Sequence, residues 1–210
     1  MKKTLFAILA ILVANHVFDE FDAKLIHWIY ELRGSHSNHS GAFYWINRVT
    51  TELGYMFVLV PLCVGVLIAF KGNLESLFFS VGTLVGWLAN KGVKKIFMRP
   101  RPLEMYRMMT ETSSSFPSGH SMSAAACYFM GAYLIYRSNL SKKLKITLTI
   151  ITAAIPVIVG ITRINLSVHF LTDVLGGLIL GLGFVCIAIF VFETLKEKGY
   201  NGLKALGKKE

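Results

Sequence analysis

The chain has 210 residues, of which 54% are hydrophobic and only 16% are charged, and its mean hydropathy is +0.55. Soluble domains carry about a quarter of charged residues, so the composition excludes an ordinary soluble protein and indicates an integral membrane protein. The formal net charge of +10 does not indicate nucleic-acid binding, because most Lys and Arg flank apolar runs and no basic stretch is interleaved with aromatic residues. We expect one membrane-embedded domain over residues 1–210.

The N-terminal segment, residues 1–17, permits two interpretations. A basic start at Lys2 and Lys3 precedes an apolar stretch over residues 4–17, with small residues at Ala10 and Ala14. This order is found in signal peptides, but the same stretch also makes a short membrane-spanning helix. We favour the helix because the chain that follows is itself rich in apolar runs.

A second element is predicted directly after this segment. Apolar residues recur there at spacings of three and four, namely Phe18, Phe21, Leu25, Trp28, Ile29 and Leu32. This periodicity predicts an amphipathic helix that lies in the membrane interface, with Asp19, Asp22 and Glu31 facing water. Residues 34–41, rich in Ser and His, then indicate a loop.

Five apolar runs follow, of roughly the length that crosses about 30 Å of hydrocarbon. They cover residues 53–70, 74–91, 122–136, 146–161 and 170–192. Pro61 and Pro156 fall inside two of them, where a kink is tolerated because neighbouring helices can satisfy the freed carbonyls. With the first helix, these runs predict an all-α polytopic membrane protein with six transmembrane helices plus the interfacial helix.

The basic residues indicate how this protein is oriented. An even number of spans puts both termini on one side, and more than half of the 22 Lys and Arg, including those of the tail after Phe192, lie on that side. Lys94, Arg101 and Arg163 lie on the other side and have a separate reason to be basic. By the positive-inside rule we expect a plasma-membrane protein whose polar motifs open to the extracytoplasmic face.

The segment Pro117-Ser118-Gly119-His120 separates a polar run from an apolar one. Pro and Ser are typical of a helix N-terminus, where free N–H groups and the helix dipole favour a bound anion. Gly119 permits close approach to that anion, and His120 places a titratable ring in the first turn. Taken alone, an ordinary capped helix is the better interpretation of this segment.

A second group of polar residues surrounds the start of the last apolar run. Ser167 is predicted to cap a helix that begins near Val168, which places His169 in the first turn and Asp173 on the same face. The carboxylate can then accept a hydrogen bond from one ring nitrogen, and the positive helix end keeps the ring neutral and nucleophilic. Arg163 ends the preceding span. Ionisable residues beside a span are costly and tend to be functional, so we favour a chemical role over simple helix capping.

Lys94 and Arg101 complete the polar set. Basic residues beside a span commonly anchor it to lipid headgroups. Here, however, a planar Arg fork and a Lys point charge are predicted to lie on the same side as Arg163, two histidines and a helix N-terminus. Transfer of a phosphoryl group needs that combination, because charge develops on the phosphate oxygens and fixed donors must meet it.

Together, Lys94-x6-Arg101-Pro102, Pro117-Ser118-Gly119-His120 and Arg163-x5-His169-x3-Asp173 resemble the three-part signature of the type-2 phosphatidic acid phosphatase superfamily. That superfamily includes bacterial phosphatidylglycerophosphate and undecaprenyl-diphosphate phosphatases, glucose-6-phosphatase and vanadium haloperoxidases. The signature spans residues 94–173, and the set in this order is specific although each part alone is weak. One departure is Thr162 before Arg163, where the family usually has Ser.

The resemblance implies a role for each residue of the signature. His169 is the nucleophile that forms a phosphohistidine, Asp173 orients it, and His120 protonates the leaving oxygen. The phosphate oxygens are held by Lys94, Arg101, Ser118, the Gly119 amide and Arg163. The family needs no metal or other cofactor.

The remaining candidate ligands do not change this expectation. The sequence lacks a carboxylate cluster for Mg²⁺, and the loop pair His36 and His39 lacks the support that a Zn²⁺ site needs. Cys63, Cys127 and Cys186 fall inside apolar runs, so we expect small core residues rather than metal ligands or disulfides.

These features predict a metal-independent membrane lipid phosphatase acting on a terminal phosphate. Phosphatidylglycerophosphate is slightly favoured over undecaprenyl diphosphate, and diacylglycerol diphosphate and phosphatidic acid present the same group. Met105, Tyr106, Met108 and Met109 are expected to form an apolar lip for the lipid chains. An anion-binding transporter is the alternative from another class, and a haloperoxidase is disfavoured because such enzymes are soluble.

Overall fold

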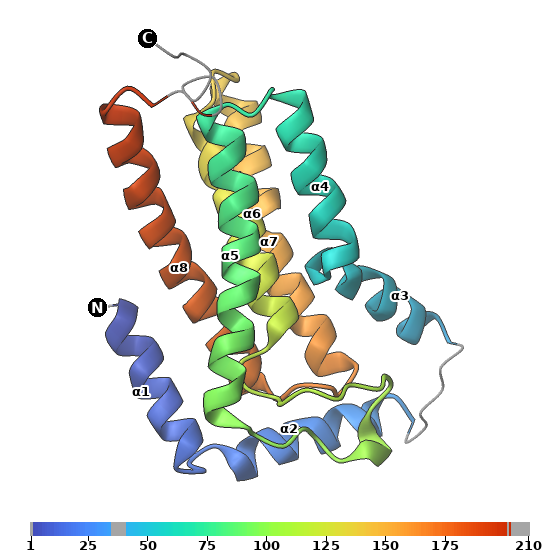
Figure 1. Ribbon diagram of the computed structural model, residues 1–210. Coiled ribbons are helices and arrows are strands. Elements are labelled where there is room, and N and C mark those ends of the chain that lie inside the picture. Colours follow the sequence, from blue (N-terminus) through green and yellow to red (C-terminus); the bar gives the residue numbers. More distant parts are fainter. Residues whose placement is uncertain (1, 35–40, 201, 203–210) are drawn as a thin grey trace.

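A computed structural model describes residues 2–34, 41–200 and 202, and every regular element within these segments is a helix (Figure 1). The all-α prediction is confirmed. The helices are α1 (Lys2–Ala14), α2 (Asp19–Leu32), α3 (Ala42–Thr51), the 3₁₀ turn η1 (Glu52–Gly54), α4 (Met56–Ala69), α5 (Leu74–Phe97), the 3₁₀ turn η2 (Glu104–Tyr106), α6 (Gly119–Arg137), α7 (Lys142–Asn165) and α8 (Leu171–Glu197). His36, His39 and the end of the Lys-rich tail lie outside the described residues.

Helix α6 forms the centre of the bundle, packed against α5, α7 and α8 (Figure 1). Its middle consists of small residues, Ala124, Ala125 and Ala126, that are fully buried. Opposite them lie glycines: a Cβ added at Gly181 of α8 would come within 2.6 Å of the Ala125 Cβ, and one at Gly86 of α5 within 2.7 Å of the Ala126 Cβ. Small residues let helix backbones approach closely inside a membrane. This close packing holds α6 against α8 near the N-terminal end of each helix.

Two of the helices, α7 and α8, are long and apolar enough to cross a membrane, and α3 to α4, bent by 45°, would make a third span. The predicted count of six is therefore not confirmed among the described residues. Helix α1 is a short apolar helix packed along α8, below the length of about 20 residues that a span needs. The small and polar residues that suit α6 to the bundle centre also lower its hydropathy.

The bounds of the predicted spans shift at several places. Helix α3 was not predicted, and the run expected over 53–70 begins only after the bend, at Met56. Helix α5 continues past residue 91 to Phe97, so Lys94 lies in its last turn, and Met98 ends it with a left-handed φ of 40°. Lys94 is therefore held on a helix beyond the end of the predicted apolar run.

Helix α2 is amphipathic as predicted and Glu31 is exposed, but the prediction that Asp22 faces water is wrong. Asp22 is fully buried and faces the protein, together with Ile26, whereas Phe21 and Trp28 are exposed. The reason is an ion pair between Asp22 and Arg99, which lies under the bundle. The helix crosses the lower end of the bundle in Figure 1, so its apolar outer face is suited to the membrane interface.

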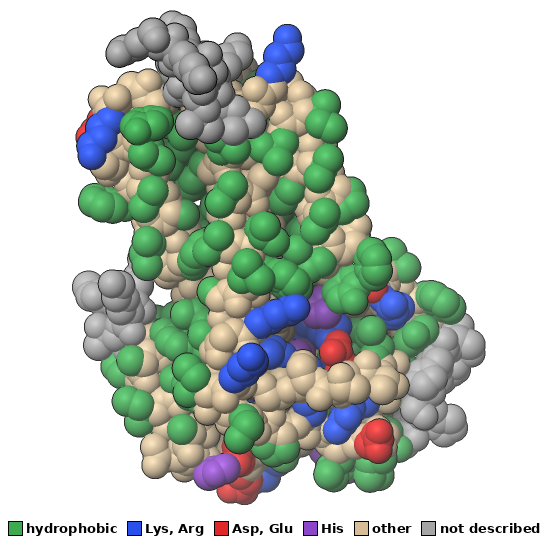
Figure 2. Space-filling model, in the orientation of Figure 1, with side chains coloured by type: hydrophobic (Ala, Val, Ile, Leu, Met, Phe, Trp, Pro, Cys, Tyr) green, Lys and Arg blue, Asp and Glu red, His purple; other side chains and the backbone are tan. Residues whose placement is uncertain are grey.

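All three signature segments meet at the end of the bundle that α2 covers. The long loop from Met98 to Ser118 and the short loop between α7 and α8 both lie there (Figure 1). Figure 2 shows the same end from outside: Lys, Arg, His and acidic side chains gather low on this face, while hydrophobic side chains cover the helices above.

Candidate active site

His169 lies in the loop between α7 and α8 rather than in the first turn of α8. The predicted helix start near Val168 is wrong, because α8 begins at Leu171 with Phe170 as its N-cap. The Asp173 carboxylate accepts the Phe170 N–H at 2.9 Å and so caps the helix itself. Ser167, which was predicted to be the cap, has a left-handed φ of 52° and accepts a hydrogen bond from Arg33.

The His169 ring is 1% exposed and has two different edges. Its Nδ1 lies 3.4 Å from the Asp173 Oδ2 and 3.4 Å from the Ser115 Oγ. The Ser115 hydroxyl donates to the same Asp173 oxygen at 2.5 Å, so acceptors face Nδ1 and the proton resides on that nitrogen. The lone pair then lies on Nε2, which faces Arg101 Nη1 at 3.2 Å.

Burial lowers the pKa of His169 well below its usual value, and the positive charge of Arg101 lowers it further. A neutral ring with an unprotonated Nε2 is the nucleophilic form of histidine. Burial also lowers the pKa of Arg101, to about 10, so the guanidinium stays protonated at neutral pH. The loop therefore presents a neutral imidazole beside a charged donor.

The polar run before the Pro117 turn holds the two cations of the first signature segment. Arg101 donates from Nε to the Ser113 carbonyl and from Nη1 to the Val168 carbonyl, both at 2.7 Å. Lys94 donates to the Ser114 carbonyl at 2.7 Å and to the Ser113 Oγ at 3.1 Å. These bonds fix both charges next to the histidine loop.

Arg163 is fully buried and meets an acidic residue that the sequence did not single out. Its guanidinium donates to the Glu111 carboxylate and, at 3.2 Å, to the Thr51 hydroxyl. The other Glu111 oxygen lies 3.6 Å from Arg101 Nη2. Glu111 thus bridges two cations as two oxygens of a phosphate would. The buried Arg163 Nε has no hydrogen-bond partner among the described residues, and such a donor calls for a ligand oxygen.

The segment Pro117 to His120 forms the start of α6, as predicted. Ser118 is the N-cap, and its Oγ accepts from the Ser121 N–H at 3.5 Å and hydroxyl at 2.9 Å. Ser118 is buried and does not line the cavity described next. Gly119 does, and a Cβ there would lie 3.1 Å from the Asn90 Oδ1. The His120 ring stacks on Tyr55 with 5.3 Å between ring centroids.

A cavity of about 190 Å³ joins these groups. Five of the predicted site residues line it: Lys94, Arg101, Gly119, His120 and His169. Arg163 and Asp173 do not line the cavity, but they contact two residues that do, Glu111 and His169 respectively. Tyr55, Met56 and Trp87 line it on another side, which gives the cavity an apolar wall.

The predicted lip is wrong for Met108, and Tyr106 lines, with Arg101, a second cavity rather than the one described above. Met108 is buried against Leu166 and Val168. Tyr106 packs against the aromatic ring of Tyr30, with 5.0 Å between centroids. The loop is folded back onto the protein, so the apolar side of the cavity comes from other elements.

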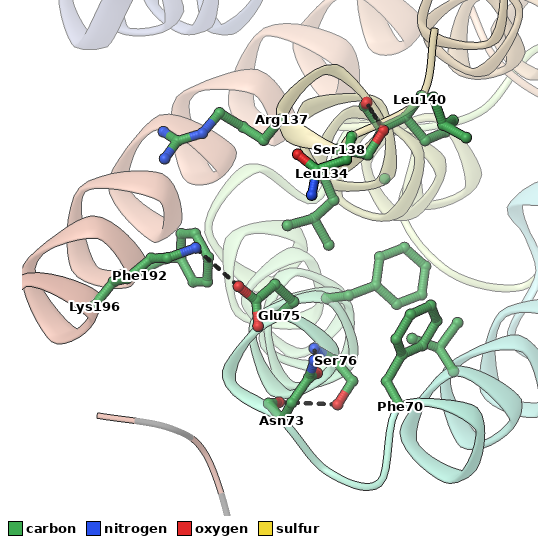
Figure 3. Close-up of a pocket in the computed structure, with 15 residues that line it drawn as sticks. Phe70, Asn73, Glu75, Ser76, Leu134, Arg137, Ser138, Leu140, Phe192 and Lys196 are labelled. Atoms are coloured by element: carbon green, nitrogen blue, oxygen red, sulfur yellow. Dashed lines mark hydrogen bonds and ion pairs between the residues drawn. The ribbon is translucent and has the colours of Figure 1, made fainter. Parts of the chain in front are cut away.

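A larger cavity, of about 590 Å³, lies at the opposite end of the bundle (Figure 3). Phe70, Leu134 and Phe192 form much of its wall, and Lys196 is paired with Glu75 at 2.9 Å. It contains no residue of the signature. Cavity volume alone would favour this cavity as the active site, whereas the signature residues line the smaller one.

Three residues of the site were missed from the sequence: Arg99, Glu111 and Ser115. Arg99 stands two positions before Arg101 in a repeated Arg-Pro pair, and the other two belong to the polar run before Pro117. Their positions beside the signature were the only signal. Over the segments that the structure describes, no three His, Cys, Asp or Glu side chains are grouped as metal ligands.

The sequence model of the PAP2 superfamily matches residues 75–197, which include all three signature segments. The chain belongs to the PAP2 superfamily. It is 40% identical over 162 residues to phosphatidylglycerophosphatase B of Bacillus subtilis (strain 168), an alignment covering 73% of this chain and 77% of that protein. A crystal structure described as the first transmembrane PAP2 type phosphatidylglycerolphosphate phosphatase from Bacillus subtilis matches with a TM-score of 0.73 and 31% identity, over 94% of both chains. The fold is thus that of a transmembrane PAP2 protein.

Proposed function

We propose that this protein is a membrane lipid phosphatase that removes a terminal phosphate through a phosphohistidine on His169. The observation that carries the proposal is the unprotonated Nε2 of His169, which lies 3.2 Å from Arg101 Nη1 in a residue that lines a cavity together with Lys94 and Arg101. Membership of the PAP2 superfamily and the 40% identity to phosphatidylglycerophosphatase B support a phosphoric ester hydrolase.

In the first step, Nε2 of His169 attacks phosphorus and the bond to the lipid oxygen breaks. His120, on the same cavity, is protonated when the negative charge of the bound phosphate offsets the surrounding cations, and it gives this proton to the lipid oxygen as the dephosphorylated lipid leaves. Lys94, Arg101 and Arg163 hold the phosphate oxygens as charge develops on them. Asp173 accepts the Nδ1 hydrogen bond of the ring that becomes cationic.

In the second step, a water molecule attacks the phosphohistidine. His120, now neutral, takes a proton from that water, and inorganic phosphate leaves as the P–N bond breaks. The protein regains its starting protonation state, so the proposed cycle uses a lipid phosphate and water and requires no metal. Ser118 acts here through the helix cap, and the Gly119 backbone lies on the cavity.

Phosphatidylglycerophosphate is the favoured substrate because the similar Bacillus subtilis protein and the matching crystal structure are both named for it. The apolar wall of Tyr55, Met56 and Trp87 suits the lipid part of such a molecule. Undecaprenyl diphosphate, with the same terminal group, is the runner-up. We further propose six spans in one domain over residues 1–210, in the plasma membrane, with this cavity facing the extracytoplasmic side.

The test is release of inorganic phosphate by purified protein in detergent with EDTA, from phosphatidylglycerophosphate, undecaprenyl diphosphate, diacylglycerol diphosphate and phosphatidic acid. We expect release from the first that survives EDTA and is abolished in His169→Ala. His27→Ala is the matched control, because His27 is exposed, contacts Glu31 and the Tyr106 ring, and does not line the signature cavity. Binding of vanadate without release of phosphate from any lipid would instead support the anion-binding transporter.

A further inference from the structure

Arg99 is a buried cation outside the catalytic cavity. Its side chain is 8% exposed, and it is absent from the cavity lining. From Nη1 it donates to the Asp173 Oδ1 at 2.8 Å and to the Thr172 hydroxyl at 2.7 Å. A cation–π contact places its guanidinium carbon 4.6 Å from the Phe170 ring centroid. Arg99 thus binds the first turn of α8, which contains the Asp173 carboxylate.

The other terminal nitrogen of Arg99 is bound to the interfacial helix. Nη2 donates to the Asp22 Oδ2 at 2.9 Å and to the Asp19 Oδ1 at 3.0 Å. Asp22 is 0% exposed and also accepts hydrogen bonds from the backbone N–H and the hydroxyl of Thr172. A buried carboxylate is retained at such a place only if it is paired. Helix α2 therefore contacts the site through its acid face.

The two carboxylate oxygens of Asp173 accept hydrogen bonds from different donors. Oδ2 accepts from Ser115 and from the Phe170 N–H and lies 3.4 Å from His169 Nδ1, whereas Oδ1 accepts from Arg99. Removing Arg99 leaves Oδ1 buried and without its charged donor. The carboxylate is then free to turn or to take up a proton, and either change alters the negative charge that lies 3.4 Å from Nδ1 of His169.

We propose that Arg99 is a positioning residue for the reaction, and that Asp22 of the interfacial helix α2 holds Arg99 in place. The chain Asp22–Arg99–Asp173–His169 then links the helix at the membrane surface to the nucleophile. This inference rests on the proposed function. Its competitor is a purely structural tie, in which Arg99 fastens α2 to the bundle without affecting the geometry of the reacting ring.

The experiment measures kcat and KM for phosphatidylglycerophosphate in lipid nanodiscs, together with the thermal unfolding of each variant. Asp22→Asn removes charge at constant side-chain size, and Arg99→Gln removes charge with a shorter polar side chain. Because neither residue touches substrate, we expect kcat to fall at least about tenfold in Arg99→Gln and several-fold in Asp22→Asn, with KM within about twofold of wild type, as for residues that orient a reacting group. Arg99→Lys, which keeps the charge but lacks the fork, should recover part of the kcat.

Matched controls lie close to Asp22 and Arg99 in the sequence. Glu20→Gln removes an exposed carboxylate of α2 that pairs with Lys24, and Lys95→Gln removes an exposed cation of the segment that leads into Arg99. Both should retain wild-type kcat. The double variant Arg99→Gln/Asp22→Asn should be no slower than Arg99→Gln, because two residues acting through one contact are not additive.

Three results would overturn the inference. One is a lower unfolding temperature with an unchanged kcat per folded molecule, which is the structural tie. Another is a raised KM, which would mean contact with substrate. The third is full additivity in the double variant. If wild type releases no phosphate, the proposed function fails, whereas an active wild type with an equally active Arg99→Gln removes only this inference.

Discussion

At the scale of single residues, the charges around His169 serve two purposes. Lys94, Arg101 and Arg163 are placed to hold an anion, and their field also opposes protonation of the ring. An imidazolium could not attack phosphorus, so the groups that attract the substrate also keep the nucleophile in its reactive form. Glu111 balances part of this charge before an anion arrives.

Replacing Arg101 by Gln removes one cause of the low pKa of His169. The pKa should rise towards the usual value of about 6.5, without reaching it, because burial remains the larger cause. The neutral, reactive ring would then be lost at a higher pH, and the acid limb of kcat/KM would move upward. Histidine ¹⁵N NMR against pH measures the shift directly, with Arg107→Gln as the control. A lower or unchanged pKa would contradict it.

Replacing Glu111 by Gln should tighten the binding of anions. The carboxylate accepts a hydrogen bond from Arg163 and lies 3.6 Å from Arg101. An incoming phosphate must therefore displace the carboxylate or bind against its electrostatic repulsion. We expect the inhibition constant of vanadate to fall by about tenfold, a free-energy change of roughly 1.4 kcal/mol. Glu104→Gln, an exposed acid of the same loop, is the control. Weaker vanadate binding would instead mean that Glu111 is needed to hold the arginines in place.

At the scale of elements, the site depends on the close approach of α6 and α8. A Cβ at Gly177 of α8 would lie 2.6 Å from the Ser118 carbonyl oxygen and 3.1 Å from the Ser121 Cβ. Ser118 in turn donates its N–H to the Asp173 carbonyl at 2.9 Å. The helix that carries His120 and the helix that carries Asp173 are therefore held together at their N-termini by a glycine.

Gly177→Ala should separate these two helix starts. Its methyl group meets backbone, which cannot turn aside as a flexible side chain can, so we expect a loss of about 1–3 kcal/mol in the free energy of unfolding and a lower kcat. Thermal unfolding in detergent and phosphate release measure the two effects. Gly183→Ala is the control on the same helix, because a Cβ there has no neighbour within 4 Å among the described residues. Equal stability of both variants would refute the close approach.

Five of the predicted site residues line one cavity. They could be predicted from the sequence because they lie at helix starts and ends, where capping residues and helical spacing indicate which side chains share a face. The sequence could not place Asp22, because a helical period indicates which residues share a face but not whether that face meets water or Arg99. It misplaced the start of α8 because Asp173, rather than Ser167, caps the helix. The role of Glu111 depends on contacts with Arg101 and Arg163, from two distant segments, which no local pattern reveals.

At the scale of the whole molecule, the two ends of the bundle have different chemistry. The end covered by α2 holds the signature residues, whereas the other end holds the turns between α4 and α5 and between α6 and α7, with Lys71, Lys142 and Lys143. Lipid phosphate headgroups lie at membrane surfaces, so only one surface can supply the substrate. Function therefore depends on which end faces outward.

We predict that the α2 end is extracytoplasmic, because the basic turns at the other end follow the positive-inside rule. Glu104→Cys, an exposed position in the loop beside the site, should react with a membrane-impermeant maleimide in intact cells. Lys142→Cys, exposed at the start of α7, should react only after the cells are opened. Wild type gives the background, since Cys63, Cys127 and Cys186 lie within helices. The reverse pattern would put the site on the cytoplasmic surface, where it would meet lipid phosphates as they are made rather than after they have crossed the membrane.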